Sequence, residues 1–280
     1  MDEAPGDATL TVQVLGPAHM PALAALADAE PLMRVEFGSL ALAQSASPRI
    51  LGAWQGHDLI AAVIDDPLAW CVTGQAEGLQ AIARQSPDLA AKLVITGRAL
   101  EVAAIDALLD ARQWREEHFM TVDRATLVAP TQPAPLRVAG PEDLALLQQA
   151  RLTALEEDLG LHLDAGSAQH RQVCDEVAGM VERQGLAVWI EQDRVAFMVR
   201  LMARTPTAAL FGDLYTAPEL RGAGRATRAL ATFCTWLMQD SAQVALRVGT
   251  ANERAVRLYQ RVGFRVVESF VSSLKPAAQA

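Results

Sequence analysis

A glycine-rich segment between a predicted strand and a predicted helix constrains this chain most. The segment is Arg221-Gly-Ala-Gly-Arg-Ala226; a strand is predicted before it at Ala208–Tyr215, and a helix at about Gly224–Met238. Glycine lets a ligand approach the backbone closely and makes positive φ angles accessible. The unpaired N–H groups of a helix's first turn and the helix dipole both favour an anion. The segment therefore predicts an anion site, most naturally for a diphosphate.

Two other phosphate-binding motifs do not fit this segment. No Gly-Lys-Ser/Thr follows the glycines, which excludes a P-loop. The run Gly222–Thr227 lacks the third glycine of a dinucleotide fingerprint, and no clear strand ending in an acid follows about 20 residues later. A tight turn with a structural role is the alternative that the segment alone leaves open.

A second segment, residues 252–264, follows a strand predicted at Val244–Val248. Asn252 is a favourable helix N-cap, apolar residues recur at helical spacing, and Gly263 suits the end of the helix. Phe264 then begins the last predicted strand, Phe264–Leu274. The segment thus predicts a helix over Asn252–Val262 that leads directly into a strand.

Together the two segments resemble the GNAT superfamily of acyl-CoA-dependent N-acyltransferases. The pyrophosphate motif of that family, Arg/Gln-x-x-Gly-x-Gly/Ala, is matched by Arg221, Gly224 and Ala226. The motif that follows it, Asn-x-x-Ala-x-x-Leu-Tyr-x-x-x-Gly-Phe, is matched in full by Asn252, Ala255, Leu258, Tyr259, Gly263 and Phe264. The specific match covers about residues 208–270. The rest of the second half agrees in the order of its elements.

The resemblance implies that the second half binds acetyl-CoA. The strand around residues 214–217 would separate from its neighbour and pair its backbone with the pantetheine amides. The N–H groups of Gly222–Ala226 would hold the pyrophosphate, and Asn252 would contact the pantetheine arm as well as cap its helix. The expected cofactor-binding residues are Leu214, Tyr215, Thr216, Arg221, Gly222, Ala223, Gly224, Arg225, Ala226 and Asn252.

Two residues are expected to act in catalysis. Tyr259 would be the general acid, because attack of an amine on a thioester expels a thiolate that a phenol can protonate; a tyrosine packed on an amphipathic helix is the alternative. Asp213 would be the general base, because family members often place an acid on that strand; a carboxylate paired with arginine is the alternative. The acidic run Glu156–Asp158 would border the acceptor cleft, although such runs usually form a solvated helix end.

The chain is predicted to contain two domains with the same order of elements. The proline-rich run Ala129–Pro135 predicts a linker between a first domain, 1–128, and a second, 136–280. In the second domain, a hairpin is predicted around Glu191–Arg194. The other elements predicted before the glycine-rich segment are a strand at Leu136–Ala139, helices at Pro141–Leu159 and Ser167–Arg183, and the hairpin strands Leu186–Ile190 and Val195–Met202. The predicted fold class is α/β (α+β): two GNAT-like lobes, each a mixed, mostly antiparallel sheet flanked by helices.

Weak internal similarity supports a duplication. Segment 51–62 aligns with 186–197 at an offset of 135 residues, and segment 108–115 aligns with 258–265 at an offset of 150. The second half therefore carries extra residues between these anchors, where its glycine loop lies. Two unrelated α/β domains that share a pattern by chance are the alternative.

The first half departs from the family at each diagnostic position. Under the 150-residue offset, the residues that replace Asn252, Tyr259 and Gly263 are Val102, Leu109 and Gln113, and no Arg-x-x-Gly-x-Gly/Ala precedes them. The first half is thus expected to be a degenerate lobe that binds no cofactor and shapes the acceptor side.

Composition and charge narrow the remaining classes of protein. A net charge of −9 argues against non-specific nucleic-acid binding. No apolar run approaches the ~20 residues of a membrane span, and the acidic N-terminus lacks the features of a secretory signal. Three widely spaced cysteines and no metal-ligand pattern, His162 and His170 included, predict a cytoplasmic protein without disulfides or a metal. Only two lysines stand among the 24 basic residues, which indicates a bacterial coding bias.

The leading hypothesis is an N-acetyltransferase that moves an acetyl group from acetyl-CoA to a primary amine by direct attack in a ternary complex. A non-catalytic acyl-CoA sensor and a tandem acyltransferase of the mycothiol-synthase type are the alternatives. The acceptor, a small molecule or a protein amine, stays open because family acceptor sites are built from variable loops. The oligomeric state, monomer or homodimer, stays open as well.

Overall fold

The computed structural model describes residues 10–27, 35, 37, 49–160 and 162–275, which fall into two compact units. The first unit comprises the chain up to His118, Gly249–Ala251 and the segment from Glu268 on. The second comprises Phe119–Val248 and Asn252–Val267. Each unit contains a mixed, mostly antiparallel sheet flanked by helices, which confirms the predicted fold class.

The second unit follows the predicted order of elements closely. Its sheet has the strand order β6-β11-β10-β9-β8-β7, which begins with the second part of β6 (Gln113–Asp123). In this sheet β10 and β11 are parallel, and the pairs from β7 to β10 are antiparallel. The elements are β7 (Arg137–Val138), η3 (Pro141–Asp143), α5 (Leu144–Leu159), α6 (Ala168–Glu182), β8 (Leu186–Glu191), β9 (Arg194–Arg204), β10 (Ala208–Tyr215), η4 (Pro218–Leu220), α7 (Arg225–Leu237), β11 (Gln243–Gly249), α8 (Glu253–Val262) and β12 (Arg265–Leu274).

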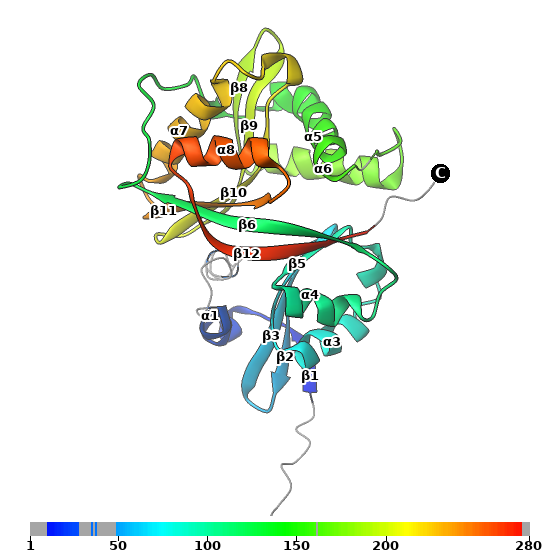
Figure 1. Ribbon diagram of the computed structural model, residues 1–280. Helices are drawn as coiled ribbons and strands as arrows, with labels where there is room; N and C mark the ends of the chain where they lie inside the picture. The colour runs from blue at the N-terminus through cyan, green and yellow to red at the C-terminus, as the bar shows by residue number, and fades with distance from the viewer. Residues whose placement is uncertain (1–9, 28–34, 36, 38–48, 161, 276–280) are drawn as a thin grey trace, which may run out of the picture. The chain divides into compact units, whose positions relative to one another are not determined.

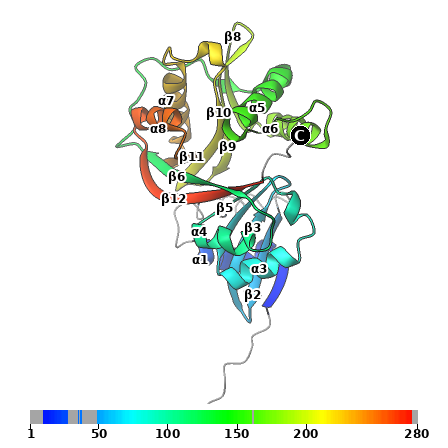
Figure 2. The ribbon, with the colours of Figure 1, turned by 45° about the vertical axis from the view of Figure 1, so that its right-hand side comes forward.

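Helices cover both faces of this sheet, α7 and α8 on one face and α5 and α6 on the other (Figures 1 and 2). Two buried apolar clusters correspond to the two faces. The first contains Phe211, Phe233 and Tyr259, and the second contains Leu147, Val177 and Met198. Alternation along the strands directs neighbouring side chains to opposite faces, so β10 contributes to both clusters.

Local sequence explains several element ends in the second unit. Gln192 and Asp193 both have positive φ and join β8 to β9, as a two-residue type I′ turn requires. The Ser167 hydroxyl caps α6 by accepting a hydrogen bond from the His170 amide at 3.1 Å. Gly263, at φ 106°, ends α8 in a left-handed conformation.

The first unit repeats the same sheet plan. Its strand order is β1-β2-β3-β4-β5-β12, again with one parallel pair, β4 and β5, among antiparallel neighbours. Helices α3 and α4 pack on one face, and α1 lies on the other (Figures 1 and 2). The elements are β1 (Leu10–Val14), η1 (Pro17–His19), α1 (Met20–Ala27), β2 (Arg49–Gln55), β3 (Asp58–Asp65), β4 (Ala69–Gly74), α3 (Ala76–Arg84), η2 (Leu89–Ala91), β5 (Val94–Gly97), α4 (Ala99–Asp106) and β6 (Gln113–Asp123).

The last strand of each half contributes to the sheet of the other unit. β6 ends the first half, but its residues from Phe119 on belong to the second unit, next to β11. β12 ends the second half, but its residues from Glu268 on belong to the first unit and pair antiparallel with β5. The units thus differ from the predicted domains 1–128 and 136–280. The segment 129–135, predicted as a linker, lies within the second unit, where Ala134 is part of the buried core.

Arg112 fastens the exchanged strand β12 inside the first unit. Its guanidinium donates hydrogen bonds to the Ser273 hydroxyl and carbonyl, both at 2.9 Å. It also donates to the carbonyls of Lys92 and Leu93, both at 3.0 Å. The side chain is 4% exposed, and burial lowers its pKa from the ordinary arginine value. One buried cation therefore holds the ends of two strands together.

Replacing Arg112 by methionine is expected to destabilise the protein by about 3 kcal/mol or more, because it removes the four hydrogen bonds that this nearly buried guanidinium donates. Urea unfolding followed by circular dichroism measures the loss. Arg84→Met is the matched control, since Arg84 is exposed and bonds Gln80; its effect should stay within about 0.5 kcal/mol. Equal midpoints for the two variants would contradict the clamp.

The described residues include no helix long and apolar enough to cross a membrane. Among the described residues, Cys71, Cys174 and Cys234 form no disulfide bond. Cys234 lies on α7 and belongs to the buried apolar core of the second unit. Burial raises the pKa of its thiol.

Candidate active site

Two parallel strands of the second unit separate at the place where the family resemblance implies a fork. The paired register of β10 and β11 ends at Phe211 and Leu246, although β10 continues to Tyr215 and β11 to Gly249. β10 also carries an irregularity between Gly212 and Tyr215 in its pairing with β9. The second half of β10 therefore has no backbone partner on its β11 side, which is the arrangement that strand addition by an extended ligand needs.

The glycine loop meets the conditions for an anion site. Gly222 and Gly224 have φ angles of 87° and 74°, and a Cβ atom at either position would meet no atom within 4 Å. The space beside both glycines is therefore open. Gly224 precedes α7, and the first backbone hydrogen bond of that helix runs from the Arg228 amide to the Gly224 carbonyl. The amides of the first turn thus have no partner within the helix.

The two arginines of the loop are paired with carboxylates. Arg221 donates to Glu157 at 2.5 Å and to the Thr216 carbonyl at 2.7 Å. Arg225 forms a two-bond pair with Glu191, at 2.8 and 2.9 Å. Because their charges are largely compensated, the backbone amides and the helix dipole carry more of the attraction for an anion than the motif alone suggests.

The expected strand residues line the fork in different ways. Leu214 packs against the core on the α7 and α8 face, whereas Tyr215 belongs to the core on the α5 and α6 face. The Thr216 hydroxyl is buried and has no hydrogen-bond partner. A buried polar atom without a partner calls for a ligand or water, so its position at the end of β10 fits an extended polar ligand.

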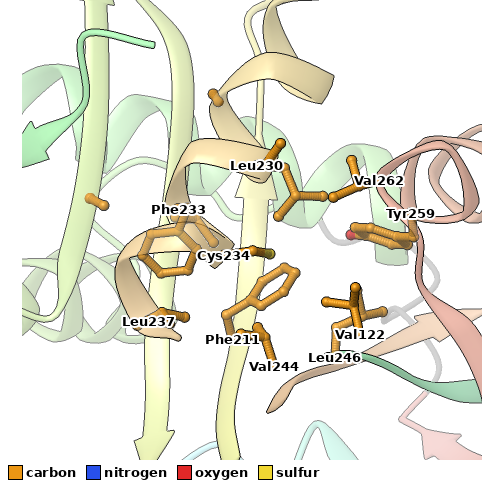
Figure 3. Close-up of a cluster of buried hydrophobic side chains, with 14 of the residues drawn as sticks. Val122, Phe211, Leu230, Phe233, Cys234, Leu237, Val244, Leu246, Tyr259 and Val262 are labelled. Atoms are coloured by element: carbon orange, nitrogen blue, oxygen red, sulfur yellow. The ribbon is translucent and has the colours of Figure 1, made fainter. Parts of the chain in front are cut away.

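Tyr259 lies deep beside the start of the fork (Figure 3). Its ring makes edge-to-face contacts with Phe211 and Phe264, with centroids 6.2 and 5.8 Å away. Burial, with a smaller contribution from the charge of Asp158, raises the pKa of Tyr259 above the ordinary value. The phenol therefore stays protonated across the neutral range, which suits a proton donor. The tyrosine is also a core residue, so both interpretations of the sequence describe it.

Asp213 sits in the irregular part of β10 and is surrounded by arginines. Its φ is 53°, a left-handed conformation that is strained for a residue other than glycine. Arg151 donates to its carboxylate at 2.8 Å, and Arg200 lies 3.5 Å away. Burial alone would raise the pKa of Asp213, but the charges of Arg151, Arg200 and Arg247 hold it below the ordinary value. The surrounding arginines favour the ionised carboxylate, as the arginine-paired alternative implies.

Acidic side chains near the end of α5 contact both the glycine loop and the start of α8, the helix that carries Tyr259. Glu157 pairs with Arg221, and the side-chain amide of Asn252 lies 3.5 Å from a carboxylate oxygen of Asp158. Asn252 also caps α8 by accepting from the Ala255 amide at 3.1 Å. The run Glu156–Asp158 therefore contacts residues of both family motifs.

A carboxylate closes the corresponding fork in the first unit. Parallel pairing of β4 and β5 ends at Cys71 and Thr96. The buried carboxylate of Glu101 follows, with one oxygen accepting from the Gly74 amide at 2.9 Å and the other from the Arg98 amide at 2.8 Å. The Gly74 and Arg98 amides, which could otherwise donate to a ligand here, therefore donate to the Glu101 side chain.

The helices of the two forks correct the 150-residue alignment. Glu101 is the third residue of α4, and the third residue of α8 is the small Ala255 of the family motif. Arg98, rather than Val102, precedes its helix as Asn252 does. Leu109 lies beyond the end of α4 at Asp106, so it is no counterpart of Tyr259. The two helices begin 154 residues apart and the strands that follow them begin 152 residues apart, so the offset of 150 does not hold here. In addition, Gln75 alone separates β4 from α3, whereas residues 216–224 lie between β10 and α7.

The structure brings most of the predicted site together and adds residues to it. The fork, the glycine loop, Asn252 and the run Glu156–Asp158 are linked by direct contacts in the second unit. Arg151, Arg200 and Glu191 were not expected from the sequence, where they stand as ordinary charged residues of helices and strands. The described residues contain no group of three or more His, Cys, Asp or Glu side chains that could hold a metal ion.

Comparison with known proteins relates this site to one family. Residues 151–264, almost all of them in the second unit, match the acetyltransferase (GNAT) family. No curated protein matches the chain significantly in sequence. Solved structures share the fold of the whole chain, and one of them is a tandem GNAT protein.

Three solved structures illustrate the likeness. A GNAT-family acetyltransferase from Colwellia psychrerythraea is 14% identical with a TM-score of 0.58, covering 95% of this chain and 100% of its own. A Drosophila protein is 12% identical with a TM-score of 0.67, covering 95% and 99%. A tandem GNAT protein from the clavulanic acid biosynthesis pathway is 13% identical with a TM-score of 0.57, covering 96% and 100%. At such identities the likeness establishes the fold alone.

Proposed function

We propose that the second unit transfers an acetyl group from acetyl-CoA to a primary amine, with one active site per chain. The observation that carries the proposal is the combination of a strand fork with an open glycine loop at the start of α7. The fork offers backbone groups to the pantetheine arm, and the first turn of α7 offers unpaired amides to the pyrophosphate. The closed fork of the first unit supports a single site.

The described residues fit acetyl-CoA in three respects. Gly222 and Gly224 leave space for phosphate oxygens beside the loop. The buried Thr216 hydroxyl has no hydrogen-bond partner, and Thr216 directly follows β10, the strand that would pair with the pantetheine amides. Asn252, at the start of α8, has its amide group directed toward α5, beside the path that the arm would follow from loop to Tyr259.

Transfer needs one bond to form and one to break. The amine nitrogen attacks the thioester carbonyl, the carbon–nitrogen bond forms, and the carbon–sulfur bond breaks. The Tyr259 phenol donates its proton to the departing sulfur, and the amine loses its own proton to water or to a nearby base. Asp213 is too strongly held as an anion to take that proton efficiently, so its part in the reaction is to position Arg151.

Replacing Tyr259 by phenylalanine is expected to lower kcat by about 100-fold, in the range of a general acid, and to leave the Kd for acetyl-CoA nearly unchanged. The change removes a hydroxyl group and keeps the ring contacts with Phe211 and Phe264. Release of free CoA with a panel of primary amines measures turnover, and calorimetry measures binding. An unchanged kcat would remove Tyr259 from the acid role, and tight binding without turnover of any amine would favour the sensor.

A further inference from the structure

One face of α5 connects two oppositely charged places in the second unit. Arg151 and Asp158 lie seven residues apart, so they share a helix face with their Cα atoms about 10 Å apart. Arg151 reaches Asp213 on β10, and Asp158 reaches Asn252 at the start of α8. The face therefore runs from the strand fork to the helix that carries Tyr259.

The cationic end of this face is built from partly buried groups. Arg151 and Arg200 have side chains 16% and 24% exposed, and both lie against the carboxylate of Asp213. Glu176 of α6 bonds Arg200 at 2.9 Å, which fixes that guanidinium from the other side. The two guanidiniums are paired with the carboxylates of Asp213 and Glu176, and the charge of Arg247 also acts on Asp213. Among these five side chains the arginines therefore outnumber the carboxylates by one, which leaves the place cationic.

Arg151 has bonding capacity that the protein does not use. It bonds Asp213 through Nη1, whereas its Nε is buried and has no hydrogen-bond partner. Nε and Nη2 form the edge of a guanidinium that grips a carboxylate with two parallel bonds. A buried donor without a partner is costly unless something outside the chain satisfies it.

The backbone at Asp213 shows that this arrangement is maintained against strain. The residue lies in an irregular stretch of β10 and adopts a left-handed conformation, which costs of order 1 kcal/mol or more for a side chain of this type. Irregularities of this kind redirect a side chain out of the ladder. Here the result is that Asp213 orients Arg151 at the start of the fork.

The other end of the face is acidic. Glu157 and Asp158 follow one another near the end of α5, and the charge of Asp158 acts on Tyr259. A protonated amine is attracted to such a place, and Tyr259 is the group proposed to serve the thioester. An acceptor that lies along α5 would thus meet a negative end near the reaction and a positive end at Arg151.

We propose that the acceptor is an amine that carries a carboxylate, gripped by the Nε edge of Arg151 with Arg200 beside it. This inference rests on the acetyl transfer proposed above. The separation of the two ends along α5 favours an acceptor whose amine and carboxylate are several bonds apart. Recognition of the carboxylate orients the amine toward the thioester.

The test compares matched acceptors on the full-length protein. Glycine, 4-aminobutanoate, 6-aminohexanoate and lysine are each measured beside their primary amides, which keep the size and remove the negative charge. We expect at least one carboxylate to exceed its amide by tenfold or more in kcat/KM, chiefly through KM. In Arg151→Gln that ratio should fall to about one while the Kd for acetyl-CoA is unchanged, and Arg151→Lys should retain part of it.

The outcomes separate this inference from the proposed function. Equal or better use of the amides by the wild type overturns the inference, and so does acetyl-CoA binding without turnover of any carboxylated amine. An acid-to-amide ratio of kcat/KM that stays at the wild-type value in both Arg151→Lys and Arg151→Gln also overturns it. A purely structural role of Arg151 would lower kcat/KM for acids and amides alike and leave their ratio intact. Failure of the wild type to bind acetyl-CoA would instead reject the proposed function itself.

Discussion

Residues 136–280 produced alone are expected to be aggregated or unfolded and to bind no acetyl-CoA. The fragment lacks the part of β6 that lies next to β11, and with it Met120 and Val122, which are buried in the core that contains Tyr259. Figure 3 shows Val122 in this core. Each such side chain contributes about 1.5–3 kcal/mol. In addition, the fragment exposes the buried residues of β12 that belong to the first unit, Phe270 and Val271 among them.

Co-production of residues 1–135 is the control for this prediction. It returns both missing strand partners, so a soluble complex of the two pieces that binds acetyl-CoA is expected. Size-exclusion chromatography and circular dichroism report the folded state of each preparation. A fragment 136–280 that unfolds cooperatively and binds acetyl-CoA by itself would show that the exchanged strands are dispensable.

Gly224→Glu is expected to weaken acetyl-CoA binding by 100-fold or more. A carboxylate at this position places negative charge where the pyrophosphate would lie, and a side chain is strained at a φ of 74°. Calorimetric titration measures the change in Kd. The unfolding midpoint of the same variant shows whether the protein is still folded during the measurement.

Two further variants separate the possible causes. Gly56→Glu carries the same substitution at another open position of positive φ, 62°, in the β2–β3 turn, and should leave binding within about twofold. Arg225→Ala should weaken binding by less than tenfold, because Arg225 already pairs with Glu191. A loss in Arg225→Ala as large as in Gly224→Glu would assign the anion site to side chains rather than to backbone amides.

The elements of the second unit could be predicted because local patterns determine them. Strand β10 has the bounds predicted for it, and the helices at Ser167 and Asn252 begin at the capping residues that the sequence indicates. The exchange of β6 and β12 could not be predicted, since either strand has the same alternating pattern in whichever sheet it pairs. The prolines of 129–135 are compatible with an extended segment packed on a core as well as with a linker, and Ala134 is buried.

The site divides in the same way. The glycine loop and the capping asparagine follow from chain-local rules, so motif spacing could locate them. The roles of Glu101 and Arg151 follow from tertiary contacts, which no local sequence pattern records. Glu101 fills the fork of the first unit, and Arg151 bonds Asp213, which lies 62 residues away in the chain. The acidity of Asp213 likewise follows from arginines on three other elements, so the residue type alone suggested a base that the surroundings do not favour.

Each chain is proposed to have one acyl-CoA site, in the second unit. Titration of the full-length wild-type protein with acetyl-CoA in a calorimeter counts the sites. We expect saturable binding with a stoichiometry of one per chain, abolished in Gly224→Glu. No binding, or two sites per chain, would rule out a single acyl-CoA site.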